Sequence, residues 1–338
     1  MAILRYILSA LLALMLTGCY EDFNPEVESA PVLCINSLIT AEEPIVVDVT
    51  RTWMYNDEES ESNHEVTDAS ITLFANGKVV SLNYLPKQGD IIRILAESPI
   101  YGTASAEVIV PYVNPIVNVR VSPAVTDISK VEENSYGGTT TAEVRFNLNI
   151  EMDVNDIAGM DNYYQFGYDC FGATVENYPD GTPTDKGILS VGKFEYNAEP
   201  IFKEHIGSFD VLMGNDQYTD FLFFSDRQFS GKVYTLHLNF TDNSFYIDPQ
   251  SQDFDEKSTD CGVTLYLVSV SESYYNWAVY KWNVEEGLTG ELSNIGLEES
   301  KWGYSNVSTG AGLVAARAST AYTVNLKDFL KVALKQIK

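Results

Sequence analysis

The sequence predicts a mainly β protein. We expect a small N-terminal β-sandwich of the immunoglobulin-like or prealbumin-like type, followed by a larger antiparallel β-sandwich or barrel-like domain with one or two packed helices. Short apolar runs bounded by Gly, Pro or Asn recur along the chain, as in all-β architectures. Apolar and polar side chains alternate over residues 144–152, which is the period of a strand with one buried face. Two segments near the C-terminal end carry the spacing of amphipathic helices instead.

Residues 1–18 have the composition of a lipoprotein signal peptide. Arg5 supplies a positive charge, and residues 7–16 form an apolar run that is too short to span a bilayer as a mature helix. The run ends in Leu16-Thr17-Gly18-Cys19, a lipobox in which cleavage before Cys19 exposes that residue to acylation. Residues 19–31 then form a polar, lipidated tether to the outer membrane. An ordinary signal peptide with a coincidental cysteine is the alternative.

Two acidic residues, Glu21 and Asp22, follow the lipidation site closely. In lipoproteins of the Bacteroidota type, such a pair resembles the signal for export to the outer face of the outer membrane. We therefore expect a lipid-anchored protein that faces the cell exterior. The alternative is that the two charges only solubilise the tether.

The small sandwich is expected over residues 32–112. Asn76-Gly77 joins two of its strands, and this pair readily adopts the positive φ angles of a tight type I′ turn. Pro111 and Pro115 bracket the junction with the next domain. The strands expected here cover residues 46–53, 69–74, 79–85, 91–96 and 104–110.

The larger β domain is expected over residues 113–338. One helix is predicted near 272–286, with Ser271 as its N-cap, and a second near 326–337, after Asn325. Long polar loops are expected at 171–187, 197–219 and 241–262, where a β scaffold commonly carries binding sites. The strands expected here cover residues 116–121, 144–152, 163–170, 221–224, 233–240, 263–270 and 313–318.

The charge of the chain limits its partners. The formal net charge is −27, so nucleic acid and anionic lipid are poor partners for its surface. Three cysteines follow Cys19. They allow one disulfide and leave one cysteine unpaired. Cys34 lies in an apolar run and is expected to be a packing thiol. Cys170 and Cys261 border strand-like segments and are the candidate disulfide, although both thiols free is the alternative.

Patterns of catalytic and metal-binding residues are mostly missing from the sequence. The three histidines, His64, His205 and His237, do not cluster, and no nucleophile elbow or phosphate-binding loop is present. We therefore expect no enzyme activity, no catalytic residue and no cofactor. One weak calcium candidate exists, although a turn at the end of a strand explains the same oxygen-rich residues: Asp153, Asn155, Asp156 and Asp161.

Several segments together resemble one family. They are Phe223–Lys232 (FFSDRQFSGK), Ser273-Tyr274-Tyr275 and, most distinctively, Tyr304–Leu313 (YSNVSTGAGL). These segments are similar to motifs of the Bacteroidota lipoproteins called domain of unknown function 4249. The resemblance implies an accessory role beside a TonB-dependent outer-membrane transporter and supplies no catalytic residues. The motif residues have the chemistry of turns and caps, so we expect them to be structural: Ser225, Asp226, Gly231, Asn306, Gly310 and Gly312.

Two hypotheses about function follow. The first is a non-enzymatic surface lipoprotein that captures a glycan or other small ligand, or partners a TonB-dependent transporter. The second is a structural or adhesive β-module of the envelope with no small-molecule ligand. Under the first, aromatic side chains in or next to loops are the candidates to stack on a ligand: Tyr163, Tyr164, Tyr178, Tyr218, Tyr246 and Trp302.

Overall fold

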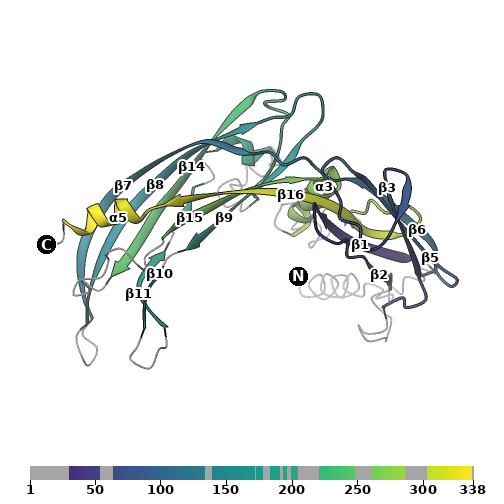
Figure 1. Cartoon of the computed structure of the whole chain (residues 1–338), viewed down its shortest axis with the longest axis horizontal. Helices are drawn as coiled ribbons and strands as arrows, with labels where there is room; N and C mark the ends of the chain where they lie inside the picture. Colours follow the sequence, from purple (N-terminus) through teal and green to yellow (C-terminus); the bar gives the residue numbers. More distant parts are fainter. Residues whose placement is uncertain are drawn as a thin grey trace, which may run out of the picture. The chain divides into compact units, whose positions relative to one another are not determined.

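The prediction of a mainly β protein is confirmed by a computed structural model of the chain (Figure 1). Residues 32–338 form one compact unit, and residues 1–31 do not belong to it. Within the described residues, no helix is both long and apolar enough to cross a membrane. The structure describes residues 30–53, 64–133, 139–171, 173–177, 183–190, 193–195, 199–204, 221–247, 261–285 and 303–336.

A four-stranded antiparallel sheet forms the outer layer of the small sandwich. Its strands run in the order β4-β3-β5-β6. The predicted hairpin is present, because Asn76 and Gly77 have φ angles of 51° and 76° and join β3 to β4. The strands are β3 (Ser70–Ala75), β4 (Lys78–Val80), β5 (Ile91–Ser98) and β6 (Gly102–Ile109).

A six-stranded sheet extends from this sandwich into the larger part of the molecule. Its order is β13-β9-β15-β16-β1-β2, so the first strand of the described chain lies beside the last. β1 and β16 are parallel, whereas the other neighbours are antiparallel. The strands are β1 (Leu33–Thr40), β2 (Asp48–Arg51), β9 (Tyr163–Phe171), β13 (Phe223–Ser225), β15 (Gly262–Val270) and β16 (Ala311–Asn325).

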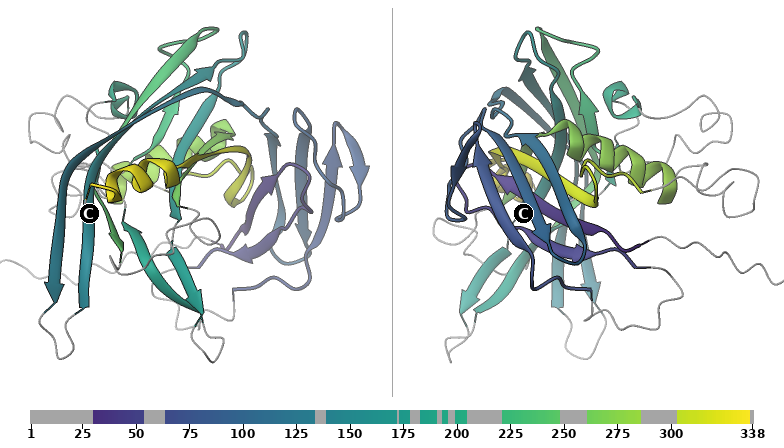
Figure 2. Two further views of the ribbon diagram at one scale, coloured as in Figure 1. Left: turned by 60° about the vertical axis from the view of Figure 1, so that its left-hand side comes forward. Right: turned by 90° about the vertical axis from the view of Figure 1, so that its right-hand side faces the viewer.

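The core of the small sandwich lies between the four-stranded sheet and β1. Leu33 and Ile35 of β1 are fully buried against Ile92 and Ile94 of β5 and against Ala104 of β6. In the left view of Figure 2, the purple strands β1 and β2 lie beside the blue strands of this layer. The predicted domain junction near residue 112 does not divide the six-stranded sheet. This sheet takes β1 and β2 from before the junction and its other strands from after it.

The third sheet contains the longest strands. Its order is β10-β11-β14-β8-β7, and the short β12 also pairs with β14. β7 and β8 are 18 and 17 residues long, well beyond the apolar segments that predicted them. The strands are β7 (Ile116–Glu133), β8 (Thr139–Asn155), β10 (Ala173–Asn177), β11 (Pro183–Ser190), β12 (Lys193–Phe194) and β14 (Val233–Ile247).

Two of the predicted loops are partly strands. β10 and β11 form a hairpin where a loop was expected over 171–187, and β14 continues to Ile247 in the segment expected as a loop from 241. Backbone pairing with neighbouring strands places these segments in the sheet. In the third predicted loop, Pro200–Lys203 forms a short 3₁₀ helix, η3.

Both predicted helices are present and close to their expected bounds. α3 spans Glu272–Glu285, and the Ser271 hydroxyl accepts a hydrogen bond of 3.3 Å from the Tyr274 N–H, as an N-cap does. α5 spans Lys327–Leu334, and the Asn325 side chain accepts from the Lys327 N–H at 2.9 Å. α5 packs on the larger core, where Leu330 is fully buried.

The segment that precedes β16 joins the two cores. Ser308 exchanges two backbone hydrogen bonds with Ser105 of β6, at 2.8 and 3.1 Å, and the Thr309 hydroxyl donates to the Thr103 carbonyl at 2.6 Å. A Cβ on Gly310 would lie only 2.7 Å from the Ala104 Cβ. Gly312 has a φ of 110°, and a Cβ there would collide with the Ile35 carbonyl.

We expect Gly312→Ala to lower the free energy of unfolding by about 2–4 kcal/mol, because it combines a left-handed backbone with a collision against β1. Gly303→Ala is the matched control, since open space surrounds its Cβ position. The control should change stability by less than about 0.5 kcal/mol. Urea unfolding of the two variants measures both values. Equal, small effects would contradict the close approach of β16 to β1.

Candidate functional site

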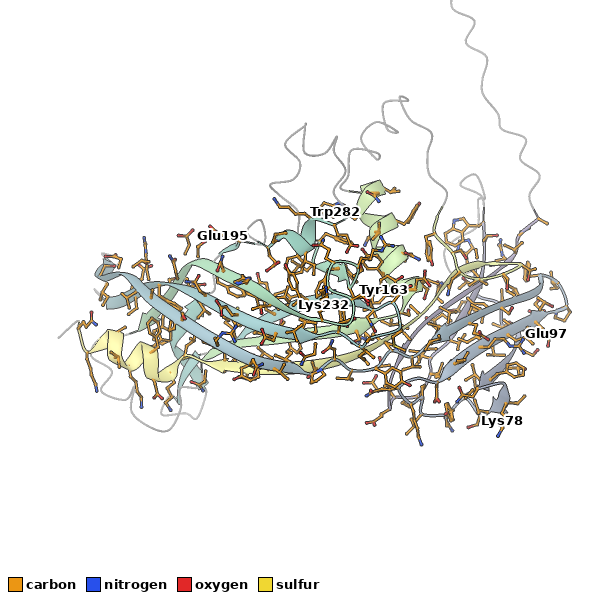
Figure 3. All side chains as sticks on the ribbon, turned by 90° about the horizontal axis from the view of Figure 1, so that it is seen from above. Lys78, Glu97, Tyr163, Glu195, Lys232 and Trp282 are labelled. Carbon is orange, nitrogen blue, oxygen red and sulfur yellow. The ribbon has the colours of Figure 1, made fainter. Side chains whose placement is uncertain are left out.

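A groove of about 560 Å³ lies where β6 meets the larger part of the molecule. Its walls come from β6 and residues 110–112, from residues 160–163 at the start of β9, from the end of β15 with the first turn of α3, and from Tyr304 and Asn306. The size is that of a small-molecule site. Figure 3 labels Tyr163 of this groove, with Trp282 further along α3.

The floor of the groove is held by polar side chains that replace backbone pairing. The Asn306 amide donates to the Val314 carbonyl at 2.8 Å and accepts from the Val314 N–H at 2.9 Å. The Ser271 hydroxyl also accepts from the Ala316 N–H at 3.0 Å, and Ser273 donates to the Val314 carbonyl at 2.9 Å. β16 and the start of α3 are therefore fixed to each other.

Two carboxylates, the half-buried Asp156 and the buried Asp226, position the wall formed by residues 160–163. Asp156 accepts from the Gly231 N–H at 2.6 Å, from the Tyr164 hydroxyl at 3.1 Å and from the Asn162 amide at 3.0 Å. Asp226 accepts from the Asn162 N–H at 3.0 Å. Burial, more than the neighbouring Asp156 charge, raises the pKa of Asp226. Asn162 therefore links the turn at Asp156 to the turn at Asp226.

The rim of the groove is acidic. Glu107, Asp161 and Glu272 line it and are exposed, and none of the described lining residues is Lys, Arg or His. Burial raises the pKa of the Tyr163 hydroxyl, and the negative charges of Glu272 and Asp161 raise it further. Burial and Glu272 likewise raise the pKa of Tyr304, against an opposing hydrogen bond to Asn276. The field at the rim is therefore negative.

The aromatic candidates for ligand contact lie in different places in the structure. Tyr163 lines the groove, and its ring centroid lies 4.8 Å from that of Tyr275 in α3. Tyr164 is 1 % exposed and belongs to the larger core, which corrects the expectation that it contacts a ligand. Tyr246 lies within β14 rather than in a loop. The remaining calls lie outside the described residues: Tyr178, Tyr218, Trp302, and Cys19, Glu21 and Asp22 of the tether.

The four residues of the calcium candidate have different surroundings. Among the described residues, no three His, Cys, Asp or Glu side chains are placed to hold a metal ion. Asp156 is surrounded by hydrogen-bond donors, Asp161 is exposed at the groove, and Asn155 pairs with Val233 in the β8–β14 ladder. Asp153 and Asp156 therefore accept hydrogen bonds at strand ends and turns.

The structure does not join Cys170 and Cys261 in the candidate disulfide. Cys170 lies opposite Val263 in the β9–β15 ladder and is exposed, whereas Cys261 is fully buried in the larger core. Partial desolvation of the Cys170 thiol raises its pKa, and the Asp169 charge raises it further. Cys34 alternates away from the buried face of β1 and is half-buried, so it is not the fully packed thiol expected.

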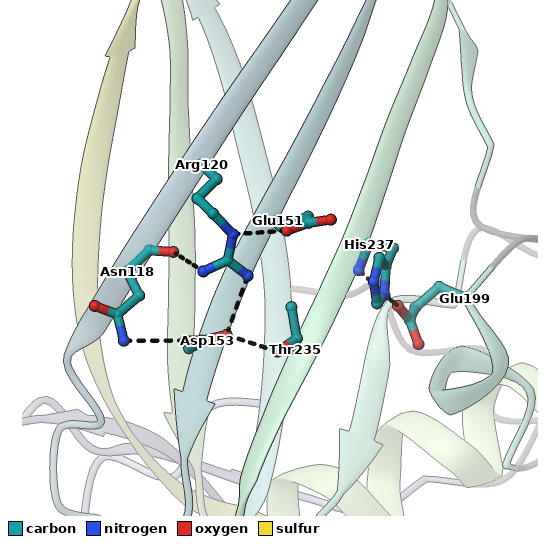
Figure 4. A network of polar contacts seen from close by, with 7 residues as sticks. All are labelled: Asn118, Arg120, Glu151, Asp153, Glu199, Thr235 and His237. Atoms are coloured by element: carbon teal, nitrogen blue, oxygen red, sulfur yellow. Dashed lines mark hydrogen bonds and ion pairs between the residues drawn. The ribbon is translucent and has the colours of Figure 1, made fainter.

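A second polar cluster lies on the sheet formed by β7, β8 and β14 (Figure 4). Asp153 is 8 % exposed and accepts from the Thr235 hydroxyl at 2.7 Å and from the Asn118 amide at 3.0 Å. The Arg120 guanidinium lies 3.8 Å from Asp153 and bonds the exposed Glu151 at 2.7 Å. These bonds satisfy the buried carboxylate, so the cluster stabilises the sheet.

At the edge of the same sheet, Glu199 is fully buried and accepts from the His237 N–H at 2.7 Å and from the Tyr234 hydroxyl. The His237 side chain is 58 % exposed. Glu199 therefore caps a strand N–H that β12 does not reach.

The resemblance motifs occupy turns and strand contacts. Ser225 donates to Glu204 at 2.6 Å, and Gly231 has a φ of 70°. Asn306, Gly310 and Gly312 hold β16 against α3, β6 and β1 as described above. Of all the residues singled out from the sequence, the structure gathers Tyr163, Asp161 and Asn306 in one groove. It adds Tyr304, which lies in a motif, Glu272, which lies in the first turn of a helix, and Glu107 and Ser269, which carried no signal in the sequence.

The model of the protein family described as Domain of unknown function (DUF4249) matches residues 20–323 of the chain. No curated protein and no solved structure matches it.

We expect Asp153→Asn to lower the free energy of unfolding at pH 7 by about 1–2 kcal/mol, because it replaces a carboxylate that accepts two hydrogen bonds beside Arg120. The bonds from Thr235 and Asn118, and then the Arg120 charge, hold the pKa of Asp153 below its usual 3.8. A lowered folded-state pKa stabilises the protein above the unfolded value, and this contribution is lost as the pH falls through the folded value. The difference between wild type and variant should therefore shrink below about pH 4.

Glu151→Gln is the control for this measurement. Arg120 and Glu151 are 54 % and 45 % exposed, so their ion pair contributes little and its loss should cost less than about 0.5 kcal/mol. Urea unfolding from pH 3 to 8 follows all three proteins. A constant difference between wild type and Asp153→Asn over that range would contradict the expected role of the carboxylate.

Proposed function

The chain belongs to the family described as Domain of unknown function (DUF4249), and from that premise we propose that it is a non-enzymatic lipoprotein of the outer membrane. It faces the cell exterior, captures a small polar ligand and partners a TonB-dependent transporter. The groove beside β6 is the observation that carries this proposal. A site of this size, walled by residues from four separate stretches of the chain, suits capture of a ligand.

The membrane part of the proposal rests on the N-terminal sequence. The lipobox ending at Cys19 supplies the anchor, and Glu21-Asp22 supplies the export signal. Several acyl chains on one cysteine give a stable anchor, since each buried CH₂ contributes about 0.8 kcal/mol. The transporter partnership rests on what the family resemblance implies.

A structural or adhesive β-module without a small ligand is the second candidate. One surface favours it. Leu38 and Val46 are 43 % and 68 % exposed beside Tyr274 and Trp277 of α3, and apolar side chains exposed together suit contact with another protein. The groove with its acidic rim favours ligand capture, because a flat adhesive surface requires neither.

Affinity purification of the tagged protein from its own outer membrane, followed by mass spectrometry, tests the proposal. We expect a TonB-dependent transporter in stoichiometric amount. Cys19→Ala is the control variant, and it should leave the membrane fraction and lose the transporter, because the acylated sulfur is gone. Purification of the wild-type protein without any transporter would contradict the proposed partnership and favour the structural module.

A further inference from the structure

One edge of the small sandwich is open where it meets the groove. β6 is the last strand of the four-stranded sheet, so β5 pairs with only one side of it. On the other side, Ser105 exchanges two backbone hydrogen bonds with Ser308. In an antiparallel pair, residues that bond one neighbour alternate with residues that face the opposite side. Glu107 and Ile109 therefore turn their backbone N–H and C=O groups to the same side as Ser105.

The hydrogen bonds at the end of β6 agree with this alternation. The Val110 N–H donates to the Asp90 carbonyl at 2.9 Å, and the Val110 carbonyl accepts from the Gly89 N–H at 2.8 Å, both on the side of β5. The β5–β6 register is continuous along the whole of β6. Among the described residues, none pairs with the backbone of Glu107 or Ile109 on the open side. Two N–H donors and two C=O acceptors are therefore unpaired along this edge.

The groove lies along this edge and not over one face of the sheet. Glu107, Val108 and Ile109 all line it, although the side chain of Val108 is buried in the small core and those of its two neighbours are exposed. Successive side chains of a strand point to opposite faces, so a groove over one face would contact only every second residue. The unpaired N–H and C=O groups therefore face the groove.

The chain itself does not form a strand at this position. The antiparallel bridge between Ser105 and Ser308 would continue with Asn306 opposite Glu107. However, the Asn306 amide bonds both the N–H and the carbonyl of Val314, at 2.9 and 2.8 Å, and holds its segment against β16. Residues 304–306 therefore contribute a wall of the groove instead of a strand beside β6.

The open edge is short. Ser308 occupies it at Ser105, and Pro111, which follows β6, has no backbone N–H. The three residues from Glu107 to Ile109 span about 10 Å, at ~3.3 Å per residue. A stable protein–protein interface commonly buries about 1,600 Å² in total, far more than so short an edge provides. The groove, of about 560 Å³, suits a short peptide instead.

An extended peptide matches this edge in its backbone and in its side chains. Its N–H and C=O groups point to one side at every second residue, as the unpaired groups of β6 do. Glu107 and Ile109 are exposed on the same face of β6, and Ile109 is 58 % exposed. A basic side chain opposite Glu107 and an apolar side chain opposite Ile109 would form favourable cross-strand pairs. A second copy of this chain fits less well, because each copy has a net charge of −27 and presents Glu107 at the same edge.

We propose that the groove binds a short peptide in an extended conformation, as an added strand of the four-stranded sheet. The peptide continues the antiparallel pairing that Ser308 begins. It exchanges hydrogen bonds with the backbone of Glu107 and of Ile109, and it carries Lys or Arg opposite Glu107. This inference rests on the proposed capture function and names the ligand class of the same groove.

Fluorescence anisotropy tests the assignment with the peptide TVTKT, which carries a dye at its N-terminus and an amide at its C-terminus. In the proposed register its valine lies opposite Ile109 and its lysine opposite Glu107. We expect binding that methylation of the lysine backbone nitrogen weakens about tenfold, because a hydrogen bond to β6 is lost and a methyl group meets the edge. Methylation of the central threonine nitrogen is the matched control. That N–H points away from β6, so the affinity should change by less than about twofold.

Ile109→Pro tests the open edge from the side of the protein. The Ile109 N–H faces the groove, so proline removes one donor from the edge and no bond to β5, and edge strands tolerate proline at such positions. We expect a midpoint of urea unfolding close to that of the wild type and an affinity for the peptide about tenfold lower. The comparison of methylated peptides uses the wild-type protein, so it stands even where Ile109→Pro unfolds.

Two further variants test the charge. Glu107→Gln should lower the affinity for the peptide about twofold to fivefold, because the cross-strand pair with the lysine loses its charge. Glu97→Gln is the control at an exposed residue of β5 that Figure 3 labels and that does not line the groove, and it should leave the affinity unchanged.

Absence of peptide binding, or equal affinities of the two methylated peptides, would overturn the added strand. Excess peptide should leave the transporter bound in the complex purified from the membrane. Release of the transporter would assign the edge to that protein and overturn the assignment of a free peptide. Failure of the proposed function appears separately, as a lipoprotein that purifies from its membrane without a transporter, because the peptide titration needs no transporter.

Discussion

The parallel pairing of β1 with β16 is the constraint on which the rest of the molecule depends. It brings together residues far apart in sequence, for the Leu313 N–H donates to the side chain of Asn36, 277 positions away, at 3.1 Å. Two glycines allow the approach, because a side chain at Gly310 would meet β6 and one at Gly312 would meet the backbone of β1. Closing so long a loop costs conformational entropy that grows only slowly with its length, and burial of one face of β1 in the small core offsets that cost. The pairing extends one sheet across both cores, and the groove lies at that junction.

Local features of the fold were predictable because they depend on neighbouring residues. Asn76-Gly77 gives a hairpin wherever the flanking runs are strand-like, and Ser271 caps a helix through its own hydroxyl. The strand partners were not predictable, because nothing in residues 33–40 indicates that they pair with 311–317 rather than only with an adjacent hairpin. The β10–β11 hairpin was missed for a related reason. Its polar sequence resembles a loop, and only the free hydrogen-bonding edge of β14 makes it a strand. The family resemblance pointed to the 304–313 segment but not to its role in joining β6 to β1.

The site was predictable only in fragments. Tyr163 was singled out as an aromatic, Asp161 as a calcium ligand and Asn306 as a motif residue, and they share one groove for reasons that none of those arguments contains. The burial of Tyr164 could have been predicted from the sequence. Successive residues of a strand face opposite sides, so two adjacent tyrosines at the start of β9 cannot both face a ligand, and Tyr164 points into the core with Phe166. Glu107 and Ser269 carried no signal, since an exposed acid among many and a serine at the end of a strand are ordinary until the fold brings them together.

The two kinds of carboxylate in this chain explain why the groove stands out. Asp153, Asp156 and Glu199 are buried or half-buried, and each is surrounded by the donors that make a buried charge tolerable. Glu107, Asp161 and Glu272 have no such donors within the described residues, and all three are exposed, so water solvates their charges. The chain therefore follows one rule for its carboxylates: those that the fold removes from water carry their own hydrogen-bond donors, and those at the groove remain in water.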